Sequence, residues 1–201
     1  GAEVVKVERK DGGEDLRAAQ DRTGGAFRPY DAVNHGKRSL AVDLDDPRGA
    51  EVVRKLASTF DVFVENYRPG AMERRGLGAE RLCAENPALI YCSLSAFGST
   101  GPYRDRAGFD LIAQAMSGIV SVTGEEGGTP VAAGVPLSDL NAGTLAALGI
   151  LSACIERTRS GRGQIVETSL FEAALAYTVW ESALYFDLGA VAKPNGSKHR
   201  L

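Results

Sequence analysis

The sequence predicts an α/β fold in which helices flank a parallel sheet. Strand and helix patterns alternate along most of the 201 residues, and repeated strand–helix–strand units give parallel strands joined by right-handed crossovers. One predicted strand, 61–65, ends at a Pro-Gly turn at 69–70. Arg68, Arg74 and Arg75 follow that strand, and open α/β sheets bind ligands at the carboxyl ends of their strands. A ligand site is therefore expected there.

The first part of the chain alternates between strand and helix patterns. A strand is expected at 4–8, a polar loop rich in Gly and Asp at 10–25, and a short strand at 39–44. Asp46 and Pro47 predict the start of a helix, because Asp is a good N-cap and Pro fits the first turn. Four residues form the apolar stripe of that helix: Val52, Val53, Leu56 and Ala57.

The second part continues the alternation after strand 61–65. The expected elements are short helices at 71–75 and 79–85, a strand at 90–95, a helix at 109–119, a glycine-rich turn at 124–128, a long helix at 138–158, a strand at 164–168 and a helix at 170–188.

Composition narrows the class of protein. A chain of 201 residues that is 44% hydrophobic can bury a core, and its net charge of −3 does not favour nucleic acid. The longest apolar run, 145–155, is interrupted by polar residues and is shorter than the ~20 residues of a membrane helix. Three cysteines without CxxC spacing indicate buried thiols in a reducing, cytoplasmic compartment. A globular protein with no membrane partner is expected.

A second polar motif precedes the long apolar helix. Ser138 is a good N-cap, and Asp139 is a good first-turn carboxylate. Helix capping alone would explain both residues.

Seven segments, taken in order, resemble family III CoA-transferases, the CaiB/BaiF family, and they cover nearly every predicted element. They are VKVER at 5–9, NHGKRS at 34–39, VENYRPGA at 64–71, GFDLIAQ at 108–114, TG at 123–124, GVPLSDLNAG at 134–143 and TRSGRGQ at 158–164.

The resemblance implies a Rossmann-like domain. Residues 1–188 would be an incomplete large CoA-binding domain, and 189–201 the start of a linker toward a small domain, so the chain is expected to be truncated at both ends. Full-length members are expected to form interlocked homodimers. The resemblance implies coenzyme A, as an acyl-CoA substrate, and no metal.

The implied activity is transfer of CoA from an acyl-CoA thioester to a carboxylic acid, with Asp139 as the nucleophile. The carboxylate would form a mixed anhydride and then an aspartyl-CoA thioester. A helix start is expected to keep Asp139 ionised, with a pKa far below neutral, and to offer N–H groups to an oxyanion.

The resemblance also implies the residues that contact CoA: Arg9, Asn66, Tyr67, Ala71 and Arg74. Arg68 and Arg75 are interpreted as solvent-exposed charges. Asp45 stands near the position where family transferases often have a lysine that contacts the nucleotide.

Two alternatives stay open. An α-methylacyl-CoA racemase shares the aspartate but needs a histidine at the position of Phe109, which cannot exchange a proton. Asp110 is next to it and is interpreted as the cap of its own helix. The other alternative is a non-catalytic CoA-binding fragment that is inactive alone.

Overall fold

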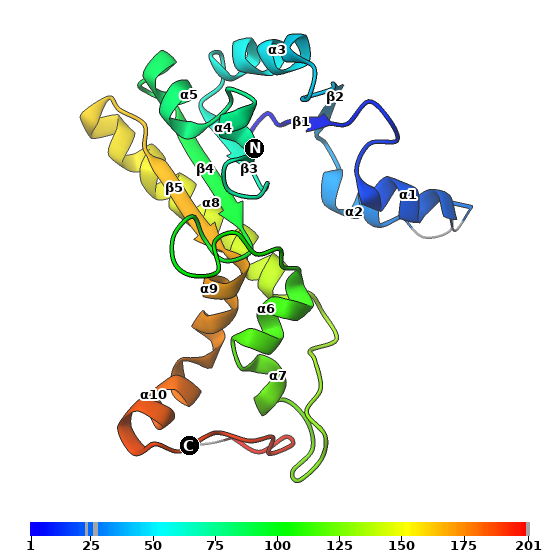
Figure 1. Cartoon of the computed structure of the whole chain (residues 1–201), viewed down its shortest axis with the longest axis vertical. Helices are drawn as coiled ribbons and strands as arrows, with labels where there is room; N and C mark the ends of the chain where they lie inside the picture. The colour runs from blue at the N-terminus through cyan, green and yellow to red at the C-terminus, as the bar shows by residue number, and fades with distance from the viewer. Residues whose placement is uncertain (23, 26–27, 200–201) are drawn as a thin grey trace.

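The structure, a computed structural model, describes residues 1–22, 24–25 and 28–199. Its strands form two parallel sheets. In the first, β1 (Val5–Glu8) pairs with β2 (Arg38–Ala41). In the second, β4 (Ile90–Ser95) lies between β3 (Val62–Glu65) and β5 (Ile165–Ser169). The predicted α/β class with parallel strands is confirmed (Figure 1).

Helices connect and flank these strands. They are α1 (Asp15–Arg22), α2 (Pro29–Asn34), α3 (Pro47–Ala57), α4 (Ala71–Arg74), α5 (Ala79–Glu85), α6 (Asp110–Met116), α7 (Ile119–Val122), α8 (Leu137–Ser160), α9 (Leu170–Leu175), the 3-10 helix η1 (Ala176–Thr178) and α10 (Val179–Leu188).

The segment 10–25, expected to be a loop, contains α1, and α2 follows it, so that expectation is wrong. Both helices are short and polar, and a tertiary contact stabilises them. The buried carboxylate of Glu8 on β1 accepts two hydrogen bonds of 2.9 Å from Arg17 and one of 3.0 Å from the Tyr30 hydroxyl. Helix and strand patterns in the local sequence cannot predict a contact of this kind.

The expected start of α3 is confirmed. Asp46 is the N-cap and accepts a 2.9 Å hydrogen bond from the Arg48 N–H, and Pro47 begins the helix. Val53 and Ala57 are buried as expected, whereas Val52 is 48% exposed and lies outside the stripe.

Two predicted helices are divided. Gly118, with φ of 92°, separates α6 from α7 within the expected helix 109–119. The expected helix 170–188 contains η1 between α9 and α10. A left-handed glycine ends a helix readily, and apolar periodicity continued across both breaks.

The protein has two hydrophobic clusters. The first joins the sheet of β3 and β4 to α3, α4 and α5, with Leu77, Leu89 and Tyr91 buried at its centre. The second joins α6, α8 and α9, with Ala142 and Ala173 buried. Helix α8 crosses the back of the sheet and begins near α6, toward which the arrows of β4 and β5 point (Figure 1). The start of α8 therefore lies at the carboxyl end of the strands.

Strand β3 is less buried than expected, since Val64 is 58% exposed. It is an edge strand of its sheet and lines the cavity between the two sheets. Cys92 is buried as predicted, while Cys83 and Cys154 are half-buried, and all three are free thiols.

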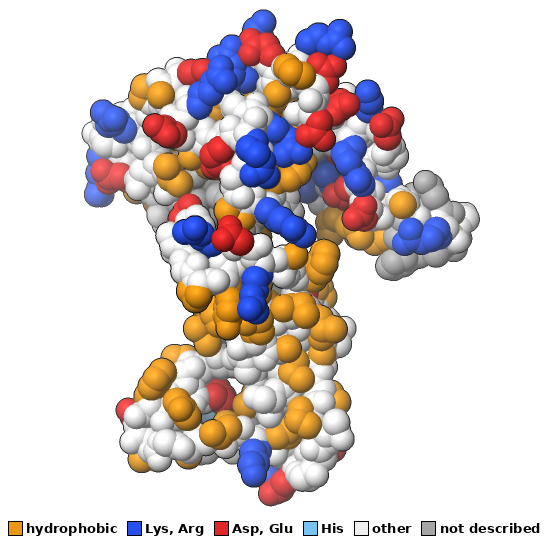
Figure 2. Space-filling model, in the orientation of Figure 1, with side chains coloured by type: hydrophobic (Ala, Val, Ile, Leu, Met, Phe, Trp, Pro, Cys, Tyr) orange, Lys and Arg blue, Asp and Glu red, His pale blue; other side chains and the backbone are white. Residues whose placement is uncertain are grey.

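Figure 2 shows charged side chains gathered over the part that carries α1 to α5, and hydrophobic surface over the part with α6 to α10. By length and composition, α8 could cross a membrane, which the interrupted apolar run in the sequence did not indicate. It packs on one side against β4, β5, α6 and α9. Its other side exposes Leu140, Leu148, Leu151 and Ile155.

Candidate active site

Asp139 is the third residue of α8, and its side chain is exposed. The N-cap of this helix is Pro136, which offers no side-chain hydrogen bond. Ser138, predicted to be the N-cap, is the second helical residue and is fully buried, so that prediction is wrong. No residue at the start of α8 therefore caps the N–H groups of its first turn with a side chain.

The cap comes from another helix. The Oδ1 atom of Asp110, at the start of α6, accepts hydrogen bonds from the backbone N–H of Ser138 at 2.8 Å and of Asp139 at 3.4 Å. Asp110 was predicted to cap its own helix, but that N-cap is Phe109. The prediction is wrong because α6 and α8 pack together, which presents the carboxylate to the neighbouring helix.

Gln114 keeps Asp110 in place. Its Nε2 donates to Asp110 Oδ2 at 2.6 Å and to the Val135 carbonyl at 3.1 Å, and its Oε1 accepts from the Ala133 N–H at 3.0 Å. The side chain is 1% exposed. Gln114 was not predicted as a site residue. A signal was present, since Asp110 and Gln114 are four residues apart, the spacing that brings helical side chains together.

The pKa of the Asp139 carboxyl is raised, first by partial burial of the group and second by the Asp110 carboxylate. The helix start had predicted a lowered pKa, so the expected direction is wrong. The physical reason is first that partial burial disfavours the charged form of Asp139, and second that the negative charge of Asp110, which already binds the first-turn N–H groups, opposes its ionisation. A raised pKa makes the carboxylate more basic.

The expectation that first-turn N–H groups of α8 would serve an oxyanion also fails in this structure. Leu137 N–H donates to the Val135 carbonyl at 2.8 Å, and Leu140 N–H donates to the Pro136 carbonyl at 3.0 Å. The two N–H groups between them bind Asp110. The Asp139 carboxylate itself accepts no hydrogen bond within the described part of the chain.

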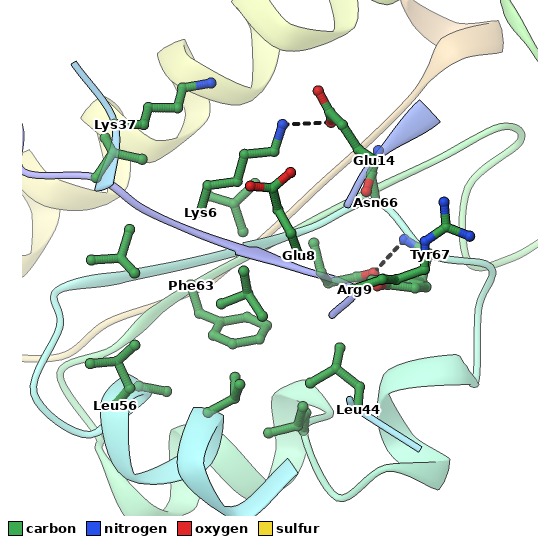
Figure 3. Close-up of a pocket in the computed structure, with 18 of the residues that line it drawn as sticks. Lys6, Glu8, Arg9, Glu14, Lys37, Leu44, Leu56, Phe63, Asn66 and Tyr67 are labelled. Carbon is green, nitrogen blue, oxygen red and sulfur yellow. Dashed lines mark hydrogen bonds and ion pairs between the residues drawn. The ribbon is translucent and has the colours of Figure 1, made fainter. Parts of the chain in front are cut away.

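A cavity of about 900 Å³ lies between β1 and β3, the facing edges of the two sheets. Three residues expected to contact CoA line it: Arg9, Asn66 and Tyr67. Figure 3 shows β1 passing above Phe63, with Arg9 at the end where Asn66 and Tyr67 also lie. Arg9 donates to the Gly13 carbonyl at 3.1 Å and to Asp15 at 2.9 Å. The structure thus brings together predicted residues that follow two separate strands, β1 and β3.

Ala71 and Arg74 lie on the short helix α4, and neither is among the residues that line this cavity. Ala71 is buried, while Arg74 is exposed and its side chain makes no hydrogen bond or ion pair with the described residues. Gly70, with φ of 81°, leaves room for Arg74, because a Cβ there would stand 3.0 Å from Arg74 Nη1. The Arg74 guanidinium is therefore available to an anion. Asp139 does not line the cavity either.

Arg75 is not a solvent-exposed charge, as had been expected. Its side chain is 23% exposed and forms an ion pair of 2.6 Å with Asp45. Arg68 is exposed, as expected. The pair gives Asp45 a partner in the protein.

A further group of cations, which was not predicted, lies in a loop outside the cavity lining. The loop follows β4, and it carries Tyr103, Arg104 and Arg106, with the Arg106 guanidinium 4.3 Å from the centre of the Tyr103 ring. Cations in a loop after a parallel strand were a usable signal. Among the residues that the structure describes, no group of three metal-binding side chains occurs.

Comparisons with known proteins agree across the chain. A sequence model of CoA-transferase family III matches residues 1–201. Succinyl-CoA:glutarate CoA-transferase from Mus musculus is 41% identical over 200 residues, which are 99% of this chain and 46% of that protein. Succinate–glutarate CoA-transferase from Agrobacterium fabrum is 40% identical over 99% of this chain and 52% of that protein. The chain thus spans about half the length of these relatives.

The fold is matched by a solved structure. The crystal structure of a CaiB/BaiF family protein from Brucella suis superposes with a TM-score of 0.89 at 37% identity. The match covers 99% of this chain and 54% of the other.

Proposed function

Because the chain belongs to CoA-transferase family III, we propose that the protein containing it moves CoA from an acyl-CoA thioester to a carboxylic acid through a covalent intermediate on Asp139. One observation supports this assignment above the others. The exposed Asp139 side chain accepts no hydrogen bond from the described residues, so its carboxylate is free to attack.

Each step would exchange one acyl bond. The Asp139 carboxylate attacks the thioester carbonyl, the C–S bond breaks, and a mixed anhydride and CoA thiolate result. The thiolate then attacks the Asp139 carbonyl of the anhydride, which releases the first carboxylate and leaves an aspartyl-CoA thioester. The acceptor carboxylate repeats both steps in reverse, which releases the new acyl-CoA and restores Asp139. Asp110 and Gln114 hold the backbone that carries the nucleophile.

We assign the CoA contacts to Arg9, Asn66, Tyr67, Ala71 and Arg74. Arg9, Asn66 and Tyr67 line one cavity, and the unpaired Arg74 guanidinium suits a phosphate, because charge-assisted hydrogen bonds are strong. Two relatives are named for glutarate and for succinate or succinyl-CoA. We propose a dicarboxylic acid as the acceptor on that basis.

The remaining expectations about the complete protein are proposals. Residues 1–188 would belong to a large CoA-binding domain, with a linker from 189, in a homodimer. The exposed apolar side of α8 is proposed as a protein–protein contact surface, because exposed apolar patches commonly mark interaction sites.

The test of the nucleophile is chemical. The complete protein, while turning over succinyl-CoA and glutarate, is treated with hydroxylamine, which converts an activated carboxyl to a hydroxamate. The peptide that contains Asp139 should gain about 15 Da. Asp139→Asn should abolish the mass gain and lower turnover by several orders of magnitude without unfolding the protein, since the side chain is exposed.

Glu156→Gln, at the far end of the same helix, is the matched control and should keep both turnover and the mass gain. Near-normal turnover by Asp139→Asn, or a hydroxamate on another residue, would exclude this mechanism.

The racemase alternative makes a different prediction. Phe109, where the racemase needs a histidine, cannot accept a proton; it is 79% exposed and immediately precedes Asp110, which binds the Asp139 backbone. A 2-methylacyl-CoA incubated with the complete protein in deuterium oxide should therefore keep its α-hydrogen. Rapid deuteration measured by mass spectrometry would favour the racemase instead. A non-catalytic CoA-binding protein would bind CoA and form no hydroxamate.

A further inference from the structure

Tyr67 follows β3 directly, and its ring is partly exposed beside the cavity. The guanidinium of Arg75, from the end of α4, lies 5.7 Å from the centre of that ring. A cation within about 6 Å of an aromatic ring is attracted to it. The position of the ring is therefore coupled to the position of Arg75.

Arg75 has little freedom of its own. Its Nη2 donates to Asp45 Oδ1 at 2.6 Å, and its Nη1 donates to the Ala71 carbonyl at 3.0 Å. Its Nε is buried and has no hydrogen-bond partner in the described part of the protein. Two bonds to a planar group fix its orientation. Asp45, in the loop after β2, thus acts on Tyr67 through Arg75.

The backbone of Tyr67 is held independently. Glu65, the last residue of β3, accepts a 2.8 Å hydrogen bond from the Tyr67 N–H. The same carboxyl group accepts a hydrogen bond from the Ser93 hydroxyl on β4. Glu65 is half-buried, so its orientation is set by the sheet.

We propose that Asp45 and Glu65 are positioning residues that hold Tyr67 as a preformed stacking surface for the nucleotide end of CoA. This inference rests on the proposed function. Aromatic rings stack on purine bases, and a ring that is already ordered loses less conformational freedom when a ligand binds. Arg9 lines the same cavity and provides positive charge nearby.

The ion pair of Asp45 with Arg75 also affects the charge beside Tyr67. A free carboxylate near phosphates would repel them. The ion pair with Arg75 offsets that charge, and Asp45 then contributes through the ring rather than by direct contact.

The experiment titrates the complete protein calorimetrically with CoA and with 3′-phosphoadenosine 5′-diphosphate, the nucleotide part of CoA. Asp45→Ala should weaken binding of the nucleotide by about 3- to 10-fold, the range expected when one side chain loses its prior order. The Asp45 side chain is 79% exposed, so the variant should fold. Arg48→Ala, which removes a comparable ion pair with Asp46 on the surface of α3, should leave the affinity unchanged.

A double-mutant comparison tests whether Asp45 acts through the Tyr67 ring or only through the stability of the fold. In a Tyr67→Ala background, Asp45→Ala should have no further effect on nucleotide affinity. Glu65→Ala should also weaken binding, whereas Glu65→Gln, which keeps an acceptor oxygen, should restore most of it.

Two kinds of failure can be told apart. If the unaltered protein does not bind CoA, the proposed function and this inference both fall. If it binds CoA but not the nucleotide, or if Asp45→Ala acts equally with and without the Tyr67 ring, only the positioning role is overturned.

Discussion

Asp110 and Asp139 are neighbouring carboxylates, and Asp110 also accepts a hydrogen bond from the backbone N–H of Asp139. Asp110 binds the N–H of Asp139 and, through its charge, contributes to the raised pKa of the Asp139 carboxyl. A nucleophilic carboxylate gains basicity from such a neighbour but is ionised over a narrower range of pH. Asp110 thus influences both the position of the Asp139 backbone and the pKa of the Asp139 carboxyl.

Asp110→Asn should lower the pKa of Asp139, because a neutral amide no longer opposes ionisation. Attack requires ionised Asp139, so the acid limb of kcat/KM should move to lower pH. The measurement is the pH profile of CoA transfer by the complete protein, with Glu156→Gln as the control that keeps the limb in place. An unmoved limb in Asp110→Asn would remove Asp110 from the titration of Asp139.

At the scale of elements, Glu8 joins the N-terminal helices to the first sheet. Its carboxylate on β1 accepts hydrogen bonds from Arg17 on α1, Tyr30 on α2 and Ser39 on β2. The hydrogen bonds from Arg17, foremost among these contacts, lower the pKa of Glu8 from its ordinary value of 4.5 to about 2. These contacts explain why polar segments with weak helix signals become ordered helices.

This arrangement predicts a loss of stability in acid. A group with a depressed folded pKa contributes stability above its unfolded pKa and loses it as pH falls through the folded value, here from about 4.5 toward 2. Glu8→Gln should lower the free energy of unfolding near pH 7 by about 2 kcal/mol, as expected for hydrogen bonds to a charged group. Denaturant unfolding from pH 7 to pH 2 measures both effects. Glu80→Gln, exposed on α5, should change neither; a pH dependence unaltered in Glu8→Gln would contradict the prediction.

At the scale of the whole molecule, two parallel sheets face each other across a cavity. β1 and β3 line it along their full lengths, and neither has a further strand partner among the described residues. Native proteins normally protect the edges of their sheets, for example by pairing them with another strand or covering them with a helix or loop. The edges of β1 and β3 both border the cavity, so a strand that entered it would have an open edge to pair with.

We expect that a strand of the complete protein fills this cavity. The amides of β1 and β3 that are not bonded to β2 and β4 should then exchange slowly with deuterium, as amides in core strands do. Hydrogen exchange of the complete protein, read at peptide level over 5–8 and 62–65, is the measurement. The amides of β4, which has neighbours on both sides, are the reference. Fast exchange at both edges beside slow exchange in β4 would show that the cavity is open.

The sequence by itself determined the α/β class, the five strands, the cap of α3 and the family resemblance. These features depend on local pattern: apolar runs, turn residues such as Pro69 and Gly70, and a capping residue such as Asp46. The helices α1 and α2 were missed because Glu8, distant in sequence, stabilises them.

Only the tertiary structure decided the surroundings of Asp139, Arg75 and Tyr67. The cap of α8 comes from α6, and the partner of Arg75 comes from the loop after β2. The pKa of Asp139 is raised first by the burial of its carboxyl in the fold and second by the Asp110 carboxylate. The cap of α8 and the Arg75–Asp45 pair are contacts between segments about 30 residues apart. Periodicity and capping rules describe neighbours along the chain, whereas charge and hydrogen bonding act between neighbours in space.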